Sequence, residues 1–252
     1  MSNPVQRIDH VVAVVEHFEV ARRVWTEAGW PVVYDGTMPT HRACCVSIGP
    51  ISLELLSAEA FDGWPALASW CAQAGRRFGL QAVALDPGDL EATVTALRHR
   101  GLAVSAPHEG HLVAPPHALP AARWRNSYLD GSAGLLPGLP SFLCEFVSPS
   151  AHLGRSVPDS PLQLVELCLG CADPEATVQV WQRGVRAAHR REGDGYVVRL
   201  GDTPVRVVPG EGLTVVVTSR GDGPTGERLA AVVPGVWFAL WEEERPPPSG
   251  RP

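Results

Sequence analysis

The chain has 252 residues, of which 45% are apolar, and a formal net charge of -6 at neutral pH. This length is enough for one large domain or two small ones with hydrophobic cores. The acidic balance and the absence of a basic block exclude nucleic acid as a partner, and no apolar run approaches the roughly 18 residues of a transmembrane helix. The chain enters its first strand without a secretory signal, so we expect a cytoplasmic protein with six reduced cysteines.

All 21 basic residues are arginine, and lysine is absent. Without a lysine amine, the chain has no Schiff-base chemistry, no lysine-bound pyridoxal phosphate and no Walker-type phosphate loop. Several large enzyme classes are therefore excluded.

The first elements in chain order form a strand, a helix and three strands. Residues 8–14 are an apolar strand, and 18–29 follow as a helix with Phe18, Ala21, Val24 and Trp25 on one face. Short strands are predicted at 31–34, 43–49 and 51–56. The unit is βαβββ.

The same order begins again further along the chain. A strand at 80–85 precedes a helix at 89–101, and a long insertion, about 102–140, separates this helix from a strand at 142–147. Loops of that length in compact domains are usually functional or mobile.

A third copy begins with a strand at 164–169 and a helix at 173–181. Strands follow at 195–201 and 203–208, and the C-terminal part adds strands at 213–218 and 236–241. The Pro-rich segment 245–252 is predicted to be disordered.

Three of these apolar strands each contain an ionisable side chain: His10, Glu54 and Glu145. Burying a charge inside a hydrophobic strand is costly unless it has a partner or a metal ion. An imidazole and two carboxylates form a donor set that suits Zn, Mn, Fe, Ni or Co. The alternative is a core histidine with hydrogen bonds and two glutamates in a wet cavity.

Other candidates lie in loops and in the insertion. His41 and the insertion's His108, His111 and His117 are further imidazoles near the expected mouth of the site. Arg123 and Arg125 flank Trp124 at alternate positions, so both arginines face one side of an extended segment and could bind a carboxylate or phosphate. The alternative is ordinary surface ion pairing. Cys168 and Cys171 have the spacing of a redox or zinc pair but lack a partner pair, so we interpret them as buried thiols.

The repeats resemble the vicinal oxygen chelate superfamily, and the order of motifs resembles its glyoxalase-like members. The resemblance extends over about residues 6–148. It rests on four stretches within that range, at 8–12, 49–55, 79–80 and 139–146. It implies an α+β fold in which paired βαβββ modules form curved mixed sheets. The paired modules, about 6–57 and 79–147, would form a domain at 1–150, and 151–244 would hold a third, degenerate module.

In that superfamily the curved sheet forms a cup that holds a divalent metal. Carried onto this sequence, the metal ligands are His10, Glu54 and Glu145, with Glu54 and Glu145 also acting in catalysis. Ala82 stands at the fourth position, where Gln81 could supply an amide oxygen if the register shifts by one residue. Arg123, Trp124, Arg125 and His41 are the expected substrate-binding residues.

The third module has Glu166 at the position of His10 and Arg206 at the position of Glu54. These opposite charges are expected to form a salt bridge where the first module would hold an ion. We therefore expect a structural or homodimer-forming role for this module.

The resemblance implies a divalent-metal-dependent lyase or isomerase acting on a small oxygenated metabolite. The alternative is a metal-free protein that binds a drug or metabolite in the same cup, which the eight tryptophans and the missing fourth ligand would suit. An extradiol-type dioxygenase fits less well, because it usually needs two histidines and one carboxylate.

Overall fold

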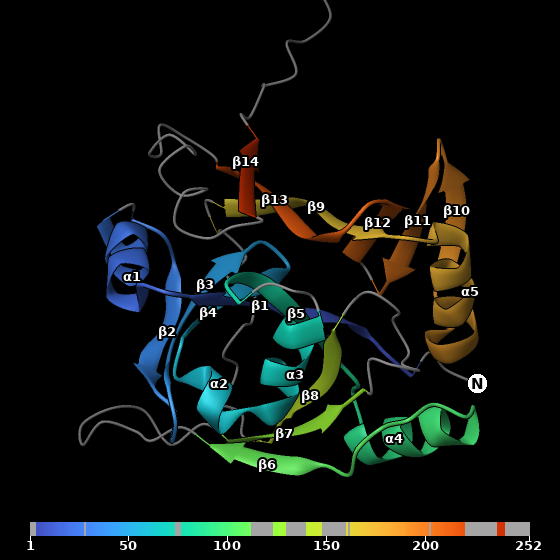
Figure 1. Ribbon diagram of the computed structural model, residues 1–252, viewed down its shortest axis with the longest axis horizontal. Coiled ribbons are helices and arrows are strands. Elements are labelled where there is room, and N and C mark those ends of the chain that lie inside the picture. The colour runs from blue at the N-terminus through green and yellow to red at the C-terminus, as the bar shows by residue number, and fades with distance from the viewer. Residues whose placement is uncertain are drawn as a thin grey trace, which may run out of the picture.

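The computed structural model describes residues 4–27, 29–73, 77–111, 123–129, 140–147, 160, 162–201, 203–219 and 236–239. Within these residues the chain forms two curved mixed sheets with helices packed against them, as shown in Figure 1. The α+β class expected from the sequence is confirmed. The segment 245–252 and His117 lie outside the described residues.

The first unit has the expected order of strand, helix and three strands. Phe18, Ala21 and Trp25 are the buried residues of its helix, which confirms the predicted apolar face. Its elements are β1 (Arg7–Val15), α1 (Phe18–Glu27), β2 (Val32–Thr37), β3 (Arg42–Ile48) and β4 (Ile51–Ser57).

The second unit repeats this order, and two short helices lie between the units. The Asp89 side chain caps the second-unit helix by accepting a hydrogen bond from the Ala92 amide at 2.9 Å. The linking helices are α2 (Ala60–Gly63) and α3 (Pro65–Gln73). The second unit contains β5 (Gly79–Asp86), α4 (Leu90–His99), β6 (His108–His111), β7 (Arg123–Tyr128) and β8 (Ser141–Phe146).

The two units join edge to edge into one eight-stranded sheet with the order β2-β3-β4-β1-β5-β8-β7-β6. At its centre β1 and β5 are antiparallel, with His10 opposite Ala84 and Val11 opposite Val83. This pairing relates the strands by a local two-fold axis, which makes Ala82 the counterpart of His10.

The remaining strands form a six-stranded sheet with the order β10-β11-β12-β9-β13-β14. Its first five elements again follow the βαβββ order, and β13 pairs antiparallel with β9 as β5 does with β1. They are β9 (Leu162–Cys171), α5 (Pro174–Val185), β10 (Ala188–Glu192), β11 (Gly195–Leu200) and β12 (Thr203–Pro209), followed by β13 (Gly212–Ser219) and β14 (Val236–Ala239).

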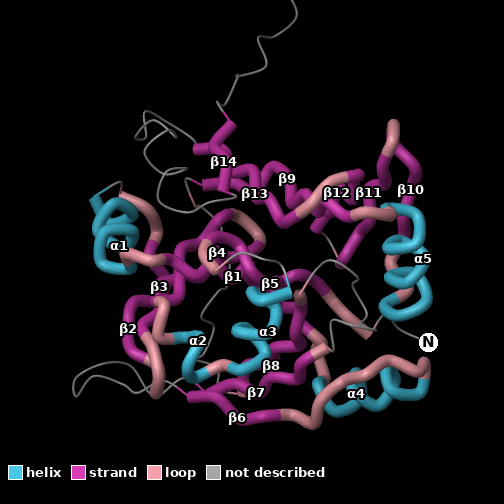
Figure 2. The backbone as a smooth tube through the Cα atoms, in the orientation of Figure 1, coloured by secondary structure: helices cyan, strands magenta, loops and turns pink. Residues whose placement is uncertain are grey.

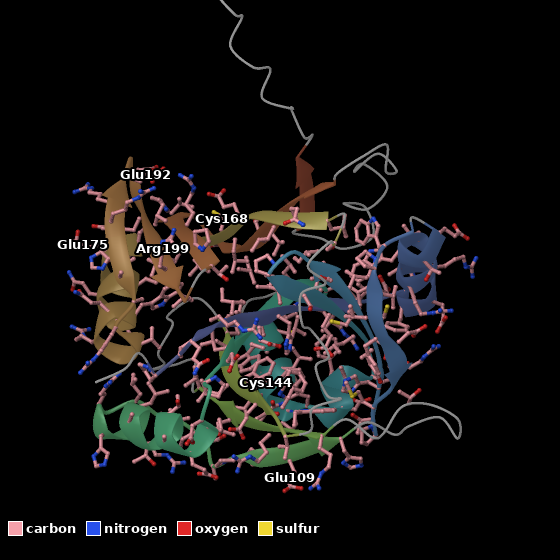
Figure 3. All side chains as sticks on the ribbon, turned by 180° about the vertical axis from the view of Figure 1, so that it is seen from behind. Glu109, Cys144, Cys168, Glu175, Glu192 and Arg199 are labelled. Atoms are coloured by element: carbon pink, nitrogen blue, oxygen red, sulfur yellow. The ribbon has the colours of Figure 1, made fainter. Side chains whose placement is uncertain are left out.

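Two hydrophobic clusters hold the molecule together. The larger one joins both sheets, with Trp25 of α1 and Trp181 of α5 among its fully buried side chains. The smaller one fills the curve of the eight-stranded sheet, where Leu67 and Trp70 of α3 pack against Phe142 and Cys144 of β8. Figure 2 shows α2 and α3 within this curve, and Figure 3 shows Cys144 in the interior. We call the hollow of the eight-stranded sheet the cup.

Candidate active site

A bulge in β1 places two neighbouring side chains together at the floor of the cup. Ile8 and His10 pair with consecutive residues of β5, so Asp9 is the extra residue in β1. The Asp9 carboxylate lies 2.8 Å from His10 Nδ1, a contact that regular alternation along a strand does not allow. Both side chains are buried.

Glu54 completes the group from the adjacent parallel strand. It pairs with Val12, and its Oε2 atom lies 3.4 Å from His10 Nε2. The two ring nitrogens of His10 therefore face two different carboxylates. We call Asp9, His10 and Glu54 the acid–base triad.

Burial and neighbouring charges act in opposite directions on the pKa values of His10 and Glu54. Burial disfavours the charged imidazole, but the hydrogen bond with Asp9 and the charges of Glu54 and Asp9 outweigh it and raise the pKa of His10. Burial also raises the pKa of Glu54, although the charge of His10 opposes that change. The arrangement favours one proton held between His10 and Glu54.

An arginine anchors the triad on its far side. Arg7 Nη2 lies 3.4 Å from Asp9, and Arg7 Nε donates to Asp86 at 3.1 Å. The guanidinium supplies a positive partner for the buried Asp9 carboxylate. Charges therefore alternate from Asp86 through Arg7 and Asp9 to His10.

A cavity of about 250 Å³ opens above His10 and Glu54. Trp64, which links α2 to α3, lies with its ring centroid 5.1 Å from that of Phe142 and 5.9 Å from that of Tyr128. The aromatic side chains that line the cavity are Trp64, Trp124, Tyr128, Phe142 and Phe146.

Of these five rings, only Trp124 was expected from the sequence. The alternation of Phe142, Cys144 and Phe146 along β8 is a usable signal for one face of a strand, whereas nothing in the sequence pattern places Trp64 over the cup.

His41 also lines the cavity, as expected. Its Nδ1 atom lies 2.9 Å from the hydroxyl of Thr40. Burial lowers the pKa of His41 to about 4, against the opposing charge of Glu59. His41 is therefore a neutral polar group at the wall, and His108 and His111 of β6 also line the cavity.

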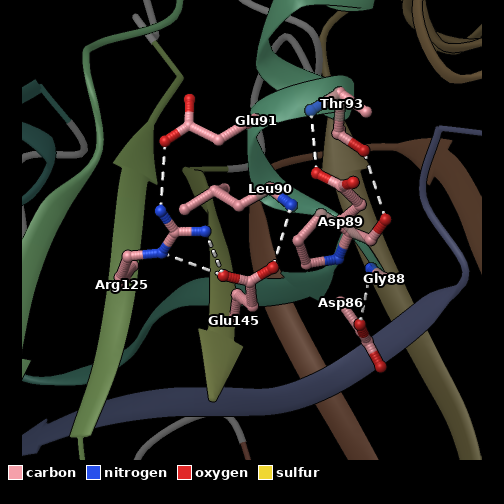
Figure 4. Close-up of polar contacts among 10 residues, drawn as sticks. Asp86, Gly88, Asp89, Leu90, Glu91, Thr93, Arg125 and Glu145 are labelled. Carbon is pink, nitrogen blue, oxygen red and sulfur yellow. Dashed lines mark hydrogen bonds and ion pairs between the residues drawn. The ribbon is translucent and has the colours of Figure 1, made fainter. Parts of the chain in front are cut away.

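Glu145 does not join His10 and Glu54, so the expected set of three ligands does not form. Its neighbours Cys144 and Phe146 line the cavity, and Glu145 points to the other face of the sheet. There it accepts hydrogen bonds from Arg125 at 2.9 and 2.6 Å and from the Leu90 amide at 3.1 Å, as Figure 4 shows.

The two arginines expected to bind substrate also face away from the cavity. Arg125 contacts Glu145 and, at 3.1 Å, Glu91 of α4. Arg123 is exposed and lies 3.0 Å from Glu109. Ordinary ion pairing, the alternative considered from the sequence, describes both.

Register explains why the cup has fewer donors than expected. The counterpart of His10 is Ala82, and the counterpart of Glu54 is Phe142, because Phe142 pairs with Ala84 as Glu54 pairs with Val12. Gln81 is the extra residue of a second bulge, the counterpart of Asp9, and it does not line the cavity.

The described donors do not make up a metal site. Catalytic metal sites normally have three protein ligands, and the cup floor supplies His10 and Glu54. Among the described residues, no group of three His, Cys, Asp or Glu side chains is arranged to hold a metal ion.

The second sheet carries the salt bridge that the sequence predicted. Glu166 contacts Arg206 Nε, and Arg206 Nη1 lies 3.6 Å from Glu192. Glu166 stands next to a bulge at Val165, as His10 stands next to Asp9, and Arg206 pairs with Cys168 as Glu54 pairs with Val12. The pair is partly exposed.

The cysteines have no disulfide partners. Five are buried, and Cys168 is half-buried at the outer face of β9 (Figure 3). Burial raises the pKa of the Cys168 thiol. The reduced state of the cysteines stays a prediction.

None of the helices in the described ranges is long and apolar enough to cross a membrane.

Solved structures with similar folds include two that match most of this chain. A hypothetical protein from Staphylococcus aureus is 14% identical, with a TM-score of 0.71 and coverage of 93% of this chain and 99% of that one. The Mn(II)-bound glyoxalase from Novosphingobium aromaticivorans is 14% identical, with a TM-score of 0.51 and coverage of 91% and 70%. At these identities the likeness shows the fold alone.

The methylmalonyl-CoA epimerase from Mycobacterium tuberculosis matches a smaller part. It is 18% identical, with a TM-score of 0.44 and coverage of 57% of this chain and 91% of that one. Comparison with curated proteins finds no match.

A family model matches the sequence of this chain over more than half of its length. Residues 8–185 match the family model described as a glyoxalase-like domain, a span that includes the whole cup. The chain therefore belongs to the glyoxalase-like domain family of the vicinal oxygen chelate superfamily.

Proposed function

We propose that this protein is a lyase or isomerase that moves a proton on a small oxygenated metabolite bound in the cup. The observation that carries the proposal is the buried acid–base triad, in which His10 lies 2.8 Å from Asp9 and 3.4 Å from Glu54 at the floor of a cavity. A perturbed acid–base pair in a cleft is typical of a catalytic site.

The triad suggests a division of roles. Glu54 would remove a proton from the carbon next to a substrate carbonyl, and His10 Nε2–H would hydrogen-bond to the carbonyl oxygen and stabilise the developing enolate. Asp9, through His10 Nδ1, would hold the ring in orientation. Return of the proton to the same or another atom would complete an isomerisation, and loss of a neighbouring group would complete an elimination.

A metal would supply Lewis-acid stabilisation of the same enolate, as expected from the sequence. The Mn(II)-bound glyoxalase shares the fold, but in this chain Ala82 and Phe142 occupy the counterpart positions of His10 and Glu54. We therefore assign enolate stabilisation to His10. The cytoplasmic location and the possible homodimer stay predictions.

The test is solvent-deuterium exchange. Hydroxyacetone and 2-hydroxyacetophenone are incubated with the protein in D₂O, and loss of the proton signal next to the carbonyl is followed by NMR. The wild type should accelerate exchange, and Glu54→Gln should lose at least about a hundredfold in rate. Glu145→Gln, on the other face of the sheet, should keep the rate.

Two results would contradict the proposal. One is the absence of accelerated exchange by the wild type, or exchange that Glu54→Gln retains. The other is activity that disappears on dialysis against a chelator and returns with Mn or Zn, which would restore the metal-dependent interpretation.

A second function is favoured by the aromatic lining. A binding protein without chemistry would use the same cavity, and it would bind ligand equally well with Glu54→Gln while showing no exchange with the wild type.

A further inference from the structure

The cup wall differs from its floor in charge. The side chains that line the cavity include no arginine among the described residues, and the chain has no lysine. An anion bound in the cavity would therefore meet no permanent positive charge from the described lining.

Two arginines of the sheet that forms the cup are paired elsewhere. Arg125 binds Glu145 and Glu91 on the outer face of the sheet, and Arg7 lies behind Asp9. At the floor, His10 faces the two carboxylates of Asp9 and Glu54. An anionic ligand would lose its hydration and gain repulsion.

Glu109 of the wall is largely exposed and pairs with Arg123, and much of the rest of the wall offers flat apolar faces. Trp64, Trp124, Tyr128 and Phe142 come from the α2–α3 link, β7 and β8, so rings surround the cavity from different directions. Aromatic rings favour offset or edge-to-face contact with another ring. The volume of about 250 Å³ is below the roughly 300–1,000 Å³ typical of sites for drug-sized molecules, which limits the ligand to a small ring system.

From these observations we infer that the ligand of this cup is a planar aromatic molecule that carries no negative charge and has an oxygenated substituent directed at His10 and Glu54. Carboxylates, phosphates and other anions are excluded by the same wall. The inference rests on the proposed site at His10 and Glu54 and names the class of molecule that the site accepts.

The test uses probes of matched shape and different charge. Benzamide and benzoate share one ring and one flat head group that is neutral or negative, and cyclohexanecarboxamide keeps the neutral head group on a non-planar ring. Binding is measured by isothermal titration calorimetry at millimolar concentrations. Benzamide should bind at least about tenfold more tightly than each of the other two, because tenfold corresponds to 1.4 kcal/mol, a small part of the cost of burying a charge or of losing the flat ring contacts.

Variants locate the binding. Trp124→Leu should weaken benzamide about tenfold, and Trp124→Phe should recover most of that loss because it restores an aromatic face. Glu145→Gln, on the other face of β8, should leave all three affinities unchanged.

Each alternative result decides against the inference. Equal or tighter binding of benzoate or cyclohexanecarboxamide overturns the charge or the shape assigned to the ligand, as does the absence of binding by all three probes. These results are independent of deuterium exchange. Loss of exchange together with a retained preference for benzamide would overturn the acid–base function and leave the ligand class in place.

Discussion

The side chains of Asp9 and His10 meet because β1 has one residue more than β5 at this point. In a regular strand these neighbours would face opposite sides of the sheet. The bulge brings a carboxylate to His10 Nδ1, which fixes the ring and leaves Nε2 directed at Glu54. We assign Asp9 a positioning role.

Asp9→Asn tests this role. An amide can still hydrogen-bond to His10 but carries no charge to stabilise the imidazolium, so exchange should slow by about tenfold or more and its pH profile should shift to lower pH. Benzamide affinity should stay within about threefold of the wild type. An unchanged pH profile would contradict the positioning role.

The lowered pKa of His41 predicts how the stability of the folded protein depends on pH. Its pKa is about 4 in the folded protein against 6.5 in a model compound, so between these values the unfolded chain binds more protons. The stability that neutral His41 contributes is fully present above pH 6.5 and is lost as the pH falls toward 4.

His41→Asn should remove this dependence. The difference in unfolding free energy between wild type and variant should change by roughly 1–3 kcal/mol between neutral pH and about pH 4, after allowance for the partial exposure of the ring. Urea denaturation at both pH values measures it. A difference that does not vary with pH would show that burial of His41 is not the cause.

At the scale of residues, four of the predicted site residues, His10, Glu54, His41 and Trp124, line the cavity, and the roles assigned to them stay predictions. Glu145 was placed wrongly because β8 pairs with β5 in a register that makes Phe142 the counterpart of Glu54. An odd shift along a strand moves a side chain to the other face, and a single sequence does not contain the pairing register.

Some helices and strands were easier to predict from the sequence pattern than others. The helices α1, α4 and α5 each have one apolar face, and all three were predicted. The short helices α2 and α3 were not predicted, because α3 is apolar around most of its circumference and has no single stripe. The polar strand β6 lay inside the predicted insertion, since its residues do not alternate between apolar and polar.

Gly110 of β6 shows how one element shapes the cavity wall. It pairs with Trp124 of β7, and a Cβ atom at Gly110 would overlap the Trp124 indole. The indole lies against the glycine because no side chain separates them.

Gly110→Ala should therefore displace Trp124 and weaken benzamide about tenfold, with a change in melting temperature of only a few degrees because β6 lies at the sheet edge. In the Trp124→Leu background the same substitution should have little further effect, since the two residues act through one contact. Additive losses in the double variant would contradict this explanation.

The two sheets of the molecule share the βαβββ order but carry different side chains at corresponding positions. The sequence predicted three modules, and register now relates their positions: His10 corresponds to Glu166, and Glu54 corresponds to Arg206. The first sheet surrounds an aromatic cavity with the acid–base triad at its floor, whereas the second carries a partly exposed ion pair. Pairs of this kind contribute little to stability.

The antiparallel pairing of β13 with β9, which extends the repeat beyond the third module, was not predicted. Strands were expected at both places, but their partners depend on contacts between residues far apart in the sequence. The shared core between the two sheets depends on such contacts as well.

The comparison of His10→Gln with Glu166→Gln in the deuterium-exchange assay tests the central claim most directly, because the two residues occupy corresponding positions in the two sheets. We expect His10→Gln to lose at least about a hundredfold in exchange rate and Glu166→Gln to keep the wild-type rate, with both variants folded by circular dichroism. Retained exchange in His10→Gln, or an equal loss in Glu166→Gln, would contradict a single acid–base site in the first cup.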